Sequence, residues 1–447
     1  MIENRSLHGA SLTARLLTVA ALIVCASSCE TRRAPAVKMH AAEFTNTLTP
    51  SDRAEIFDLV WRTVNEDYYD PSFHGVNWAE ARERYRPRME AAENDQEFYA
   101  QFEVMLAELR DAHTSFSPPP PPGTPPEGQP GSLGLSLAES EGQTVVSEVE
   151  ADSGAARAGV RPGMILRTVN GRPVEELYAL IRANFAGTSS ERAFAVLQRQ
   201  AILYGGFLPK PRTLGLLSFD NSPFEATLEQ TPTAQSPPRV EARRLASGVG
   251  YIKFDRWMPP ADARFNAELG KLRDTPGLVI DLRANGGGQT DALLNIASNF
   301  FAAPTYVGGF RRRDGTLDRY LTHARAAHPP YLQPVVILVD ERSASASETF
   351  TIFMQESGRA YVIGRQSNGA LLNTRIRRIK GGGELRVSVR AYVSPRGRVP
   401  EGAGVVPDQT VPLTISDLRQ GRDAALAAAE AYLAARARLT GRPPPQP

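Results

Sequence analysis

Three serines alternate with alanines in Ser343-Ala-Ser-Ala-Ser347, shortly after the apolar run Val335–Val339. The apolar run predicts a buried strand, and the residues after Ser347 predict a helix, so the serines lie at a strand-to-helix turn. A serine at such a turn is exposed, and the helix N-terminus favours negative charge beside it. The pattern therefore fits a nucleophile at Ser345, and it equally fits Ser345 or Ser347 capping the helix.

A second candidate site follows another predicted buried strand, Leu278–Leu282, where Asn285 precedes three consecutive glycines. Consecutive glycines expose backbone N–H groups, which can act as oxyanion donors. They could also cradle a phosphate, but the Gly-Lys-Ser/Thr ending of a phosphate loop is missing. A flexible turn is the remaining interpretation.

The composition excludes several classes of protein. The chain has 447 residues, with 42% hydrophobic and 22% charged residues, which excludes collagen-like, coiled-coil and fully disordered proteins. Lys plus Arg is 51 and Asp plus Glu is 49, so a nucleic-acid partner bound through a basic surface is not expected. The two cysteines lie near the N-terminus and the six histidines form no HExxH or HxH spacing, so neither a metal site nor a cofactor is expected.

The N-terminus has the features of an export signal. Arg5 and Arg15 precede an apolar run, residues 16–26, that is shorter than the roughly 20 residues needed to span a bilayer. Small residues then lead into Cys29, and this resembles a bacterial lipobox, although Ala26 stands where Leu is usual. An ordinary cleaved signal peptide is the alternative.

The lipobox interpretation predicts a lipoprotein signal peptide at residues 1–28 and a tether at 29–48. Cys29 would carry the lipid and become the first residue of the mature protein. The protein is then expected to be exported and anchored to a membrane of the cell envelope, facing the periplasm, without spanning that membrane.

Periodicity predicts a small helical domain over residues 49–117. Asp52 and Glu55 fit a capping box for its first helix, a second helix is expected over 78–92, and a third begins near Asp95. Residues 118–130 contain eight prolines, which stiffen the backbone into an extended linker and mark a domain boundary.

Residues 131–204 resemble a PDZ domain. Short strands are punctuated by glycine and proline from Gly131 to Val174, and a helix is expected from Glu175 to Asn184. PDZ domains offer a sheet edge to which an extended peptide adds as a strand. The loop that would present N–H groups to a terminal carboxylate consists of Gly131, Ser132, Leu133, Gly134 and Leu135.

The rest of the chain divides into three parts. Residues 205–247 are rich in proline, and we expect an irregular insertion or connector there. From residue 248 to 415 strands alternate with helices, which predicts an α/β domain with a sheet core. Residues 416–447 are expected to form a C-terminal helix and a tail.

Several motifs in order along the chain resemble the carboxyl-terminal processing proteases and the related tricorn core protease. The motifs are residues 69–78, Glu108-Leu-Arg-Asp-Ala-His-Thr114, the PDZ segment, Asp281-Leu-Arg283, Ser343–Glu348 and Gly404-Val-Val-Pro-Asp408. The resemblance implies a multidomain α/β and α+β fold with a helical N-terminal domain, a PDZ domain and a ClpP/crotonase-like α/β protease core. It also implies a serine endopeptidase that cleaves proteins or peptides captured by a C-terminal or extended segment.

The resemblance assigns Ser345 as the nucleophile, with oxyanion donors at the Ala346 N–H and at the N–H of Gly287 or the adjacent Gly288. In the processing proteases a lysine activates the serine, but Ala370 occupies that position here and cannot accept a proton. Lys380, the next lysine downstream, is a weak candidate for a substitute base.

The tricorn branch uses a histidine from the helical segment and a late glutamate, and these positions fall on His113 and Glu401. The resemblance therefore implies a Ser345-His113-Glu401 triad, with Glu348 in a supporting role. Two alternatives remain open, because His113 could be structural and Glu401 a solvated loop carboxylate. The chain would then be an inactive pseudoprotease that binds peptides through its PDZ domain, or a scaffold that tethers a partner protease at the cell envelope with the PDZ domain as adaptor.

Overall fold

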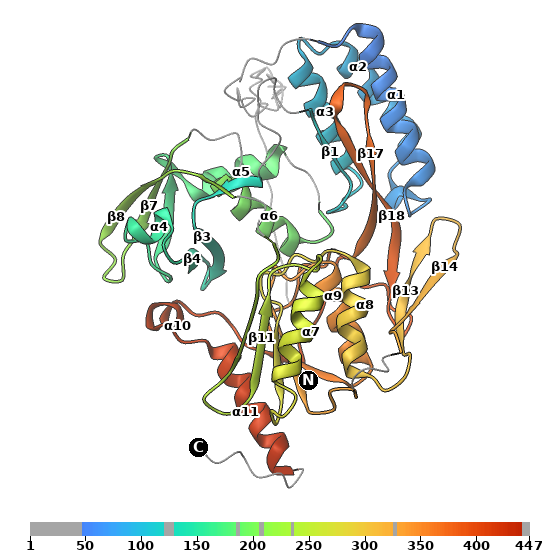
Figure 1. The fold of residues 1–447 in the computed structure, drawn as a ribbon. Helices are drawn as coiled ribbons and strands as arrows, with labels where there is room; N and C mark the ends of the chain where they lie inside the picture. Colours follow the sequence, from blue (N-terminus) through green and yellow to red (C-terminus); the bar gives the residue numbers. More distant parts are fainter. Residues whose placement is uncertain are drawn as a thin grey trace, which may run out of the picture. The chain divides into compact units, whose positions relative to one another are not determined.

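The computed structural model describes residues 47–119, 129–184, 188–204, 210–233, 237–324 and 329–439, all within the compact unit Lys38–Pro447 (Figure 1). The predicted signal peptide, Cys29 and nearly all of the tether lie outside these residues. Most of the proline-rich linker lies outside them too. Among the described helices, none has both the length and the apolar character needed to cross a bilayer.

The N-terminal segment forms three helices: α1 (Pro50–Asp67), α2 (Trp78–Glu90) and α3 (Asp95–Ala107), with a 3₁₀ turn at Phe73–Gly75. The expected capping box at Asp52 and Glu55 was wrong by one turn. The Thr49 hydroxyl accepts the Asp52 N–H at 3.1 Å, and the Asp52 carboxylate accepts the Thr49 N–H at 2.9 Å. Helix α1 therefore starts at Pro50, whose missing N–H costs nothing at that position.

Strand β1 (Ser115–Ser117) attaches this helical segment to the protease core. It pairs antiparallel with β18 (Glu384–Val393), with Phe116 opposite Leu385. Phe116 also stacks on Phe102 of α3, so the helices and β18 share one apolar core. The remaining strands of this sheet are β13 (Tyr306–Arg312), β14 (Leu317–Leu321) and β17 (Leu372–Arg378), and a 3₁₀ turn, Lys380–Gly382, joins β17 to β18.

The PDZ segment forms a sheet in the order β3-β4-β5-β7-β8, in which β3 is an edge strand. The strands are β3 (Leu135–Ser140), β4 (Gln143–Val149), β5 (Ile165–Val169), β7 (Arg212–Leu217) and β8 (Pro223–Leu228), and β6 (Arg172–Pro173) pairs with β5. The helices are α4 (Gly154–Arg157), α5 (Val174–Asn184) and α6 (Glu191–Tyr204).

Much of the segment 205–247, which we expected to be irregular, forms strands. Strands β7 and β8 extend the PDZ sheet, β9 (Thr231–Thr233) pairs with β2 (Gln129–Ser132), and β10 (Val240–Arg244) pairs with β11 of the core. Prolines misled the prediction because they lie at strand starts or edges: Pro211 precedes β7, and Pro223 opens the edge strand β8.

The core sheet has the order β10-β11-β12-β15-β16-β19. Its further strands are β11 (Gly250–Phe254), β12 (Leu278–Asp281), β15 (Val335–Val339), β16 (Ala360–Gly364) and β19 (Gln409–Thr410), and these five run parallel. Both faces are buried, as parallel sheets require. Its helices are α7 (Ala261–Lys271), α8 (Thr290–Ala297) with a 3₁₀ turn at Ser298–Phe300, α9 (Ala346–Glu356), α10 (Ile415–Gln420) and α11 (Ala424–Leu439).

Alternate strand residues face opposite helices. Ile280 and Ile337 pack into the core that contains residues of α7, α8 and α9, whereas Val279 and Val336 pack with residues of α11 (Figure 1). Since β12 and β15 are parallel neighbours, the loops that follow them emerge side by side. These loops carry the glycines and the serines singled out in the sequence.

Candidate active site

Ser345 lies at a tight turn between β15 and α9, where it is the residue that precedes the helix. Its φ of 54° and ψ of −115° are rarely adopted by residues with a side chain, so the turn stores strain. The Ser345 N–H donates to the Ala370 carbonyl at 2.9 Å and to the Glu348 carboxylate at 3.0 Å. These two contacts hold the turn in its strained conformation.

The three serines of this turn have different contacts. The Ser343 hydroxyl donates to the Leu282 carbonyl at 2.8 Å, and the Ser347 hydroxyl donates to the Asn285 carbonyl at 2.9 Å. Both bonds tie the turn to the neighbouring glycine loop. The Ser345 hydroxyl donates to no group in the described part of the chain, so it is the member of the trio that keeps its proton available for chemistry. Its position before α9 is also that of a helix cap, so this alternative interpretation is compatible with the geometry.

The glycine loop lies directly against Ser345. A Cβ on Gly287, whose φ is 98°, would come within 2.7 Å of the Ser345 Cβ and 2.9 Å of the Ala346 nitrogen, so no side chain fits there. The Gly287 N–H, one of the expected oxyanion donors, donates to the Asn285 side chain at 3.0 Å. The N–H groups of Ala346 and Gly288 have no acceptor within the described ranges, and they are the candidate donors that remain.

Glu348 organises the turn from a fully buried position. Its carboxylate accepts hydrogen bonds from the Gly369 N–H at 2.6 Å, the Ala370 N–H at 2.9 Å, the Ser367 hydroxyl and the Ser345 N–H. Burial raises the pKa of Glu348, and these donors oppose the shift. Glu348 thus has contacts that suit the expected supporting role, because its carboxylate joins the serine turn to the loop that carries Ala370.

Neither lysine position supplies a base. Ala370, which the resemblance places where the processing proteases have a lysine, is buried, and its carbonyl accepts the Ser345 N–H. Lys380 forms ion pairs with Asp52 at 2.9 Å and Glu55 at 2.8 Å on helix α1. These acids raise the pKa of Lys380, so it stays protonated within the helical segment.

His113 and Glu401, far apart in sequence, lie together with Asp111. One side-chain ligand atom from each of the three residues lies within 4.8 Å of the others. The Asp111 carboxylate accepts the backbone N–H of His113 at 2.7 Å, and the Glu401 carboxylate accepts the backbone N–H of Leu371 at 2.6 Å. Among the described residues, His113 Nδ1 and Glu401 Oε1 are both buried without a hydrogen-bond partner, so each of these neighbouring side chains keeps one polar atom available.

Burial has opposite effects on these two groups. It lowers the pKa of His113, with Arg386 acting in the same direction and Asp111 against it. Burial raises the pKa of Glu401 to about 8, and the negative charge of Asp111 adds to that shift. His113 is therefore kept neutral near pH 7, which is the form that can accept a proton.

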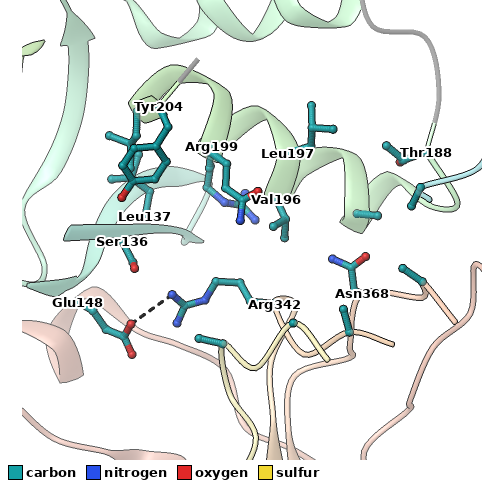
Figure 2. A pocket seen from close by; sticks show the side chains of 18 of the residues that line it. Ser136, Leu137, Glu148, Thr188, Val196, Leu197, Arg199, Tyr204, Arg342 and Asn368 are labelled. Atoms are coloured by element: carbon teal, nitrogen blue, oxygen red, sulfur yellow. Dashed lines mark hydrogen bonds and ion pairs between the residues drawn. The ribbon is translucent and has the colours of Figure 1, made fainter. Parts of the chain in front are cut away.

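His113 and the serine turn border the same cavity, which has a volume of about 490 Å³. Ala344 and Ala370, the neighbours of Ser345 in space, line it together with His113. No hydrogen bond joins His113 to Ser345 in the described structure. The PDZ segment forms the opposite wall through β3 and α6, so the sheet edge and the serine turn share one space (Figure 2).

Two backbone groups of the predicted carboxylate-binding loop already have side-chain hydrogen-bond partners. The Gly134 N–H donates to the Ser132 hydroxyl at 2.9 Å, and the Tyr204 hydroxyl of α6 donates to the Leu135 carbonyl at 2.9 Å. Leu133 and Leu135 are buried, and the burial of Gly131 lies outside the description.

The Asp111, His113 and Glu401 side chains could also coordinate a divalent cation, since carboxylate and imidazole ligands suit Zn²⁺. Histidine spacing could not reveal this group, because its third member comes from a distant loop. Sequence reasoning also missed Arg192 of α6, which no motif marked. Its guanidinium donates to the carbonyls of Ser367, Gly402 and Ala403 at 2.7–3.0 Å, and it thereby contacts the loops that carry Ala370 and Glu401.

Three segments of the chain match models of known protein families. Residues 248–411 match peptidase family S41, residues 49–107 match the tricorn protease C1 domain, and residues 124–185 match the PDZ domain. Residues 248–411 therefore form a domain of peptidase family S41. The resemblance to carboxyl-terminal processing and tricorn-like proteases is thereby confirmed.

Curated relatives are similar over most of this chain. It is 27% identical over 359 residues to the carboxyl-terminal-processing protease of Synechocystis sp., covering 78% of this chain and 79% of that protein. It is 26% identical over 383 residues to the putative tricorn protease homolog 2 of Streptomyces coelicolor, covering 82% of this chain and 31% of that protein.

Solved structures share the fold. The photosystem II D1 C-terminal processing protease superposes with a TM-score of 0.58 at 23% identity, covering 82% of this chain and 94% of that one. Mature CPAF superposes with a TM-score of 0.62 at 14% identity, covering 83% of this chain and 94% of that one. The expected fold, with an N-terminal helical region, a PDZ domain and an α/β protease core, is confirmed.

Proposed function

We propose that this S41 member is an active serine endopeptidase whose catalytic triad is Ser345, His113 and Glu401. The observation that carries the proposal is the closeness of His113 to Glu401 beside the cavity that the serine turn borders. Each of the two side chains has a buried atom, Nδ1 or Oε1, that lacks a hydrogen-bond partner among the described residues. A histidine oriented by a carboxylate is the arrangement that activates a serine when no lysine is present.

In this mechanism a closure brings His113 Nε2 to the Ser345 hydroxyl. The imidazole then removes the hydroxyl proton as the oxygen attacks the scissile carbonyl. The Ala346 N–H and the Gly288 N–H stabilise the oxyanion of the tetrahedral intermediate. His113 then protonates the leaving amine, and water hydrolyses the acyl-enzyme by the reverse sequence of proton transfers. No cofactor takes part.

The substrate is a protein or peptide that enters as an extended segment along β3. The free edge of β3 and the facing helix α6 provide the groove, and its continuity with the serine turn supports delivery of the bound segment to Ser345.

Labelling with a fluorophosphonate probe tests the triad. The wild type should gain the probe mass on Ser345, the Ser345→Ala variant should gain none, and His113→Ala should react slower by about 10³ or more, as expected for loss of a triad base. Unchanged labelling of His113→Ala would exclude the triad.

A pseudoprotease scaffold is the second candidate. The alanine at position 370 and the absence of a His113–Ser345 hydrogen bond among the described residues favour it. A wild type that resists the probe and cleaves no unfolded protein, yet binds peptides, would establish this alternative.

We also propose that the protein is exported and lipidated at Cys29. The basic, apolar and small-residue pattern before Cys29 supports this proposal. Metabolic labelling with a fatty acid should modify the wild type and leave Cys29→Ala unlabelled, whereas equal labelling of both would exclude the anchor.

A further inference from the structure

Arg199 of helix α6 lines the cavity of the proposed active site, and it has no ion-pair partner among the described residues. Figure 2 shows its side chain projecting from α6 toward the core. It is half-buried, and within the described ranges it forms no ion pair, hydrogen bond or ring contact. Arg192 on the same helix differs, since three backbone carbonyls accept its donors.

The other charged groups of the cavity do not neutralise Arg199. Glu148 is the acidic side chain in the cavity lining, and it pairs with Arg342 at 3.2 Å (Figure 2). Arg342 also pairs with Asp340 at 3.3 Å. Leucines and alanines make up much of the remaining wall, together with Val196. A cation that lines a cavity and has no acidic partner there favours an incoming anion.

We propose that Arg199 selects substrates with an acidic side chain close to the C-terminus. The inference rests on the proposed peptide binding along β3 and adds a specificity determinant to it. The ligand chemistry is a carboxylate on an extended peptide whose terminal residue lies near Leu135.

The helix geometry sets the position of that acidic residue. Tyr204 contacts Leu135 at the start of β3, and Arg199 precedes Tyr204 by five helical residues, or about 7.5 Å along the axis. An extended chain advances about 3.3 Å per residue, so this distance corresponds to two residues. Arg199 therefore faces the side chain two positions before the terminal residue.

Peptide binding to the full chain carrying Ser345→Ala tests the inference without cleavage. Fluorescein-labelled decapeptides ending in Glu-Leu-Ala, Gln-Leu-Ala and Lys-Leu-Ala are compared by fluorescence anisotropy. The Glu peptide should bind about fivefold tighter than the Gln peptide, as expected for a partly exposed ion pair, and the Lys peptide should bind most weakly. Adding Arg199→Glu should reverse the order so that Lys binds best.

Arg161→Glu, a charge reversal at an exposed position of the PDZ segment outside the cavity, is the matched control and should keep the original order. Equal affinities for the three peptides, or an order that Arg199→Glu leaves unchanged in a folded variant, would overturn the inference. A wild type that resists the probe but keeps the Glu preference contradicts only the proposed peptidase activity.

Discussion

The chemistry of the site depends on a few groups whose protonation is set by burial. His113 and Glu401 are partly buried beside Asp111, and burial makes the histidine tend to lose its proton while the glutamic acid tends to keep it. A working triad needs the neutral imidazole and the ionised carboxylate together. The pH at which both conditions hold is therefore determined mainly by Glu401.

We expect peptidase activity to rise with pH through an apparent pKa near 8, because burial raises the pKa of Glu401 to about 8. The value measured would belong to the coupled pair. The profile of kcat/KM against pH for a peptide substrate checks this, and Glu401→Gln should remove the rise along with most of the activity. Full activity at pH 6 with no increase toward pH 9 would contradict it.

The same shift should make stability depend on pH. The native carboxyl keeps its proton up to pH about 8, whereas the unfolded chain loses it near 4.5, so the native state holds more protons between these values. The free energy of unfolding then falls as the pH rises through this window, by at most about 1.4 kcal/mol per pH unit. In urea unfolding at pH 5, 6.5 and 8, Glu401→Gln should become progressively more stable relative to the wild type, while Ser345→Ala should follow the wild-type slope.

Glu348→Gln should destabilise the protein and lower activity, because an amide nitrogen would face backbone donors that now bond to a carboxylate oxygen. An unsatisfied buried donor costs about 1–3 kcal/mol, and we expect a loss in that range. Urea denaturation measures it. Glu268→Gln, which removes the partner of Lys271 on α7, should change stability by less than about 0.5 kcal/mol. Similar small effects for both variants would show that Glu348 does not hold the turn.

The turn between β15 and α9 combines strain with exposure. Ser345 adopts a backbone conformation that glycine tolerates and alanine does not. The strain is maintained by the Ser345 N–H contacts and by the close approach of Gly287.

Ser345→Gly should therefore be more stable than Ser345→Ala by about 1 kcal/mol, although both variants lack the nucleophile. Glycine relieves the backbone strain of the folded state, but it also gives the unfolded chain more conformational entropy. The expected difference in stability is the first effect minus the second. Thermal unfolding of the two inactive proteins measures it. An alanine variant at least as stable as the glycine variant would show that the turn stores little strain.

The sequence predicted those elements whose pattern is local. The strands before the glycine and serine loops, the helix after Ser345 and the PDZ segment follow from runs of apolar residues and from glycine and proline positions. Strands β7 and β8 were missed because prolines at their starts look like loop signals when the partner strands are unknown. Asp111 and Arg192 were missed for a similar reason, since each acquires its role through contacts that only the folded chain makes.

At the scale of the whole molecule, Arg192 connects peptide binding to the catalytic loops. It lies on the helix that forms one wall of the groove, and its guanidinium contacts the loops that carry Ala370 and Glu401.

Arg192→Ala should lower kcat/KM by about tenfold or more while peptide affinity changes less than about twofold, because the groove residues remain and the loops lose three charge-assisted bonds. Peptidase assays and anisotropy with the Ser345→Ala form give the two readouts. Arg182→Ala on α5, which removes an exposed pair with Glu191, serves as the control and should change neither. Parallel losses of affinity and turnover in Arg192→Ala would show that it acts on binding alone.

Strand β1 has a consequence for how the enzyme could be divided. The proposed base His113 immediately precedes the short pairing with β18, so a fragment starting at Gln129 would carry the nucleophile and Glu401 without their proton acceptor. Two separately expressed pieces, one ending within the proline-rich stretch and one beginning after it, should each be inert and should regain turnover on mixing. Reconstitution would depend on burying Phe116 against Leu385, so hydrolysis would report directly on docking of the two pieces.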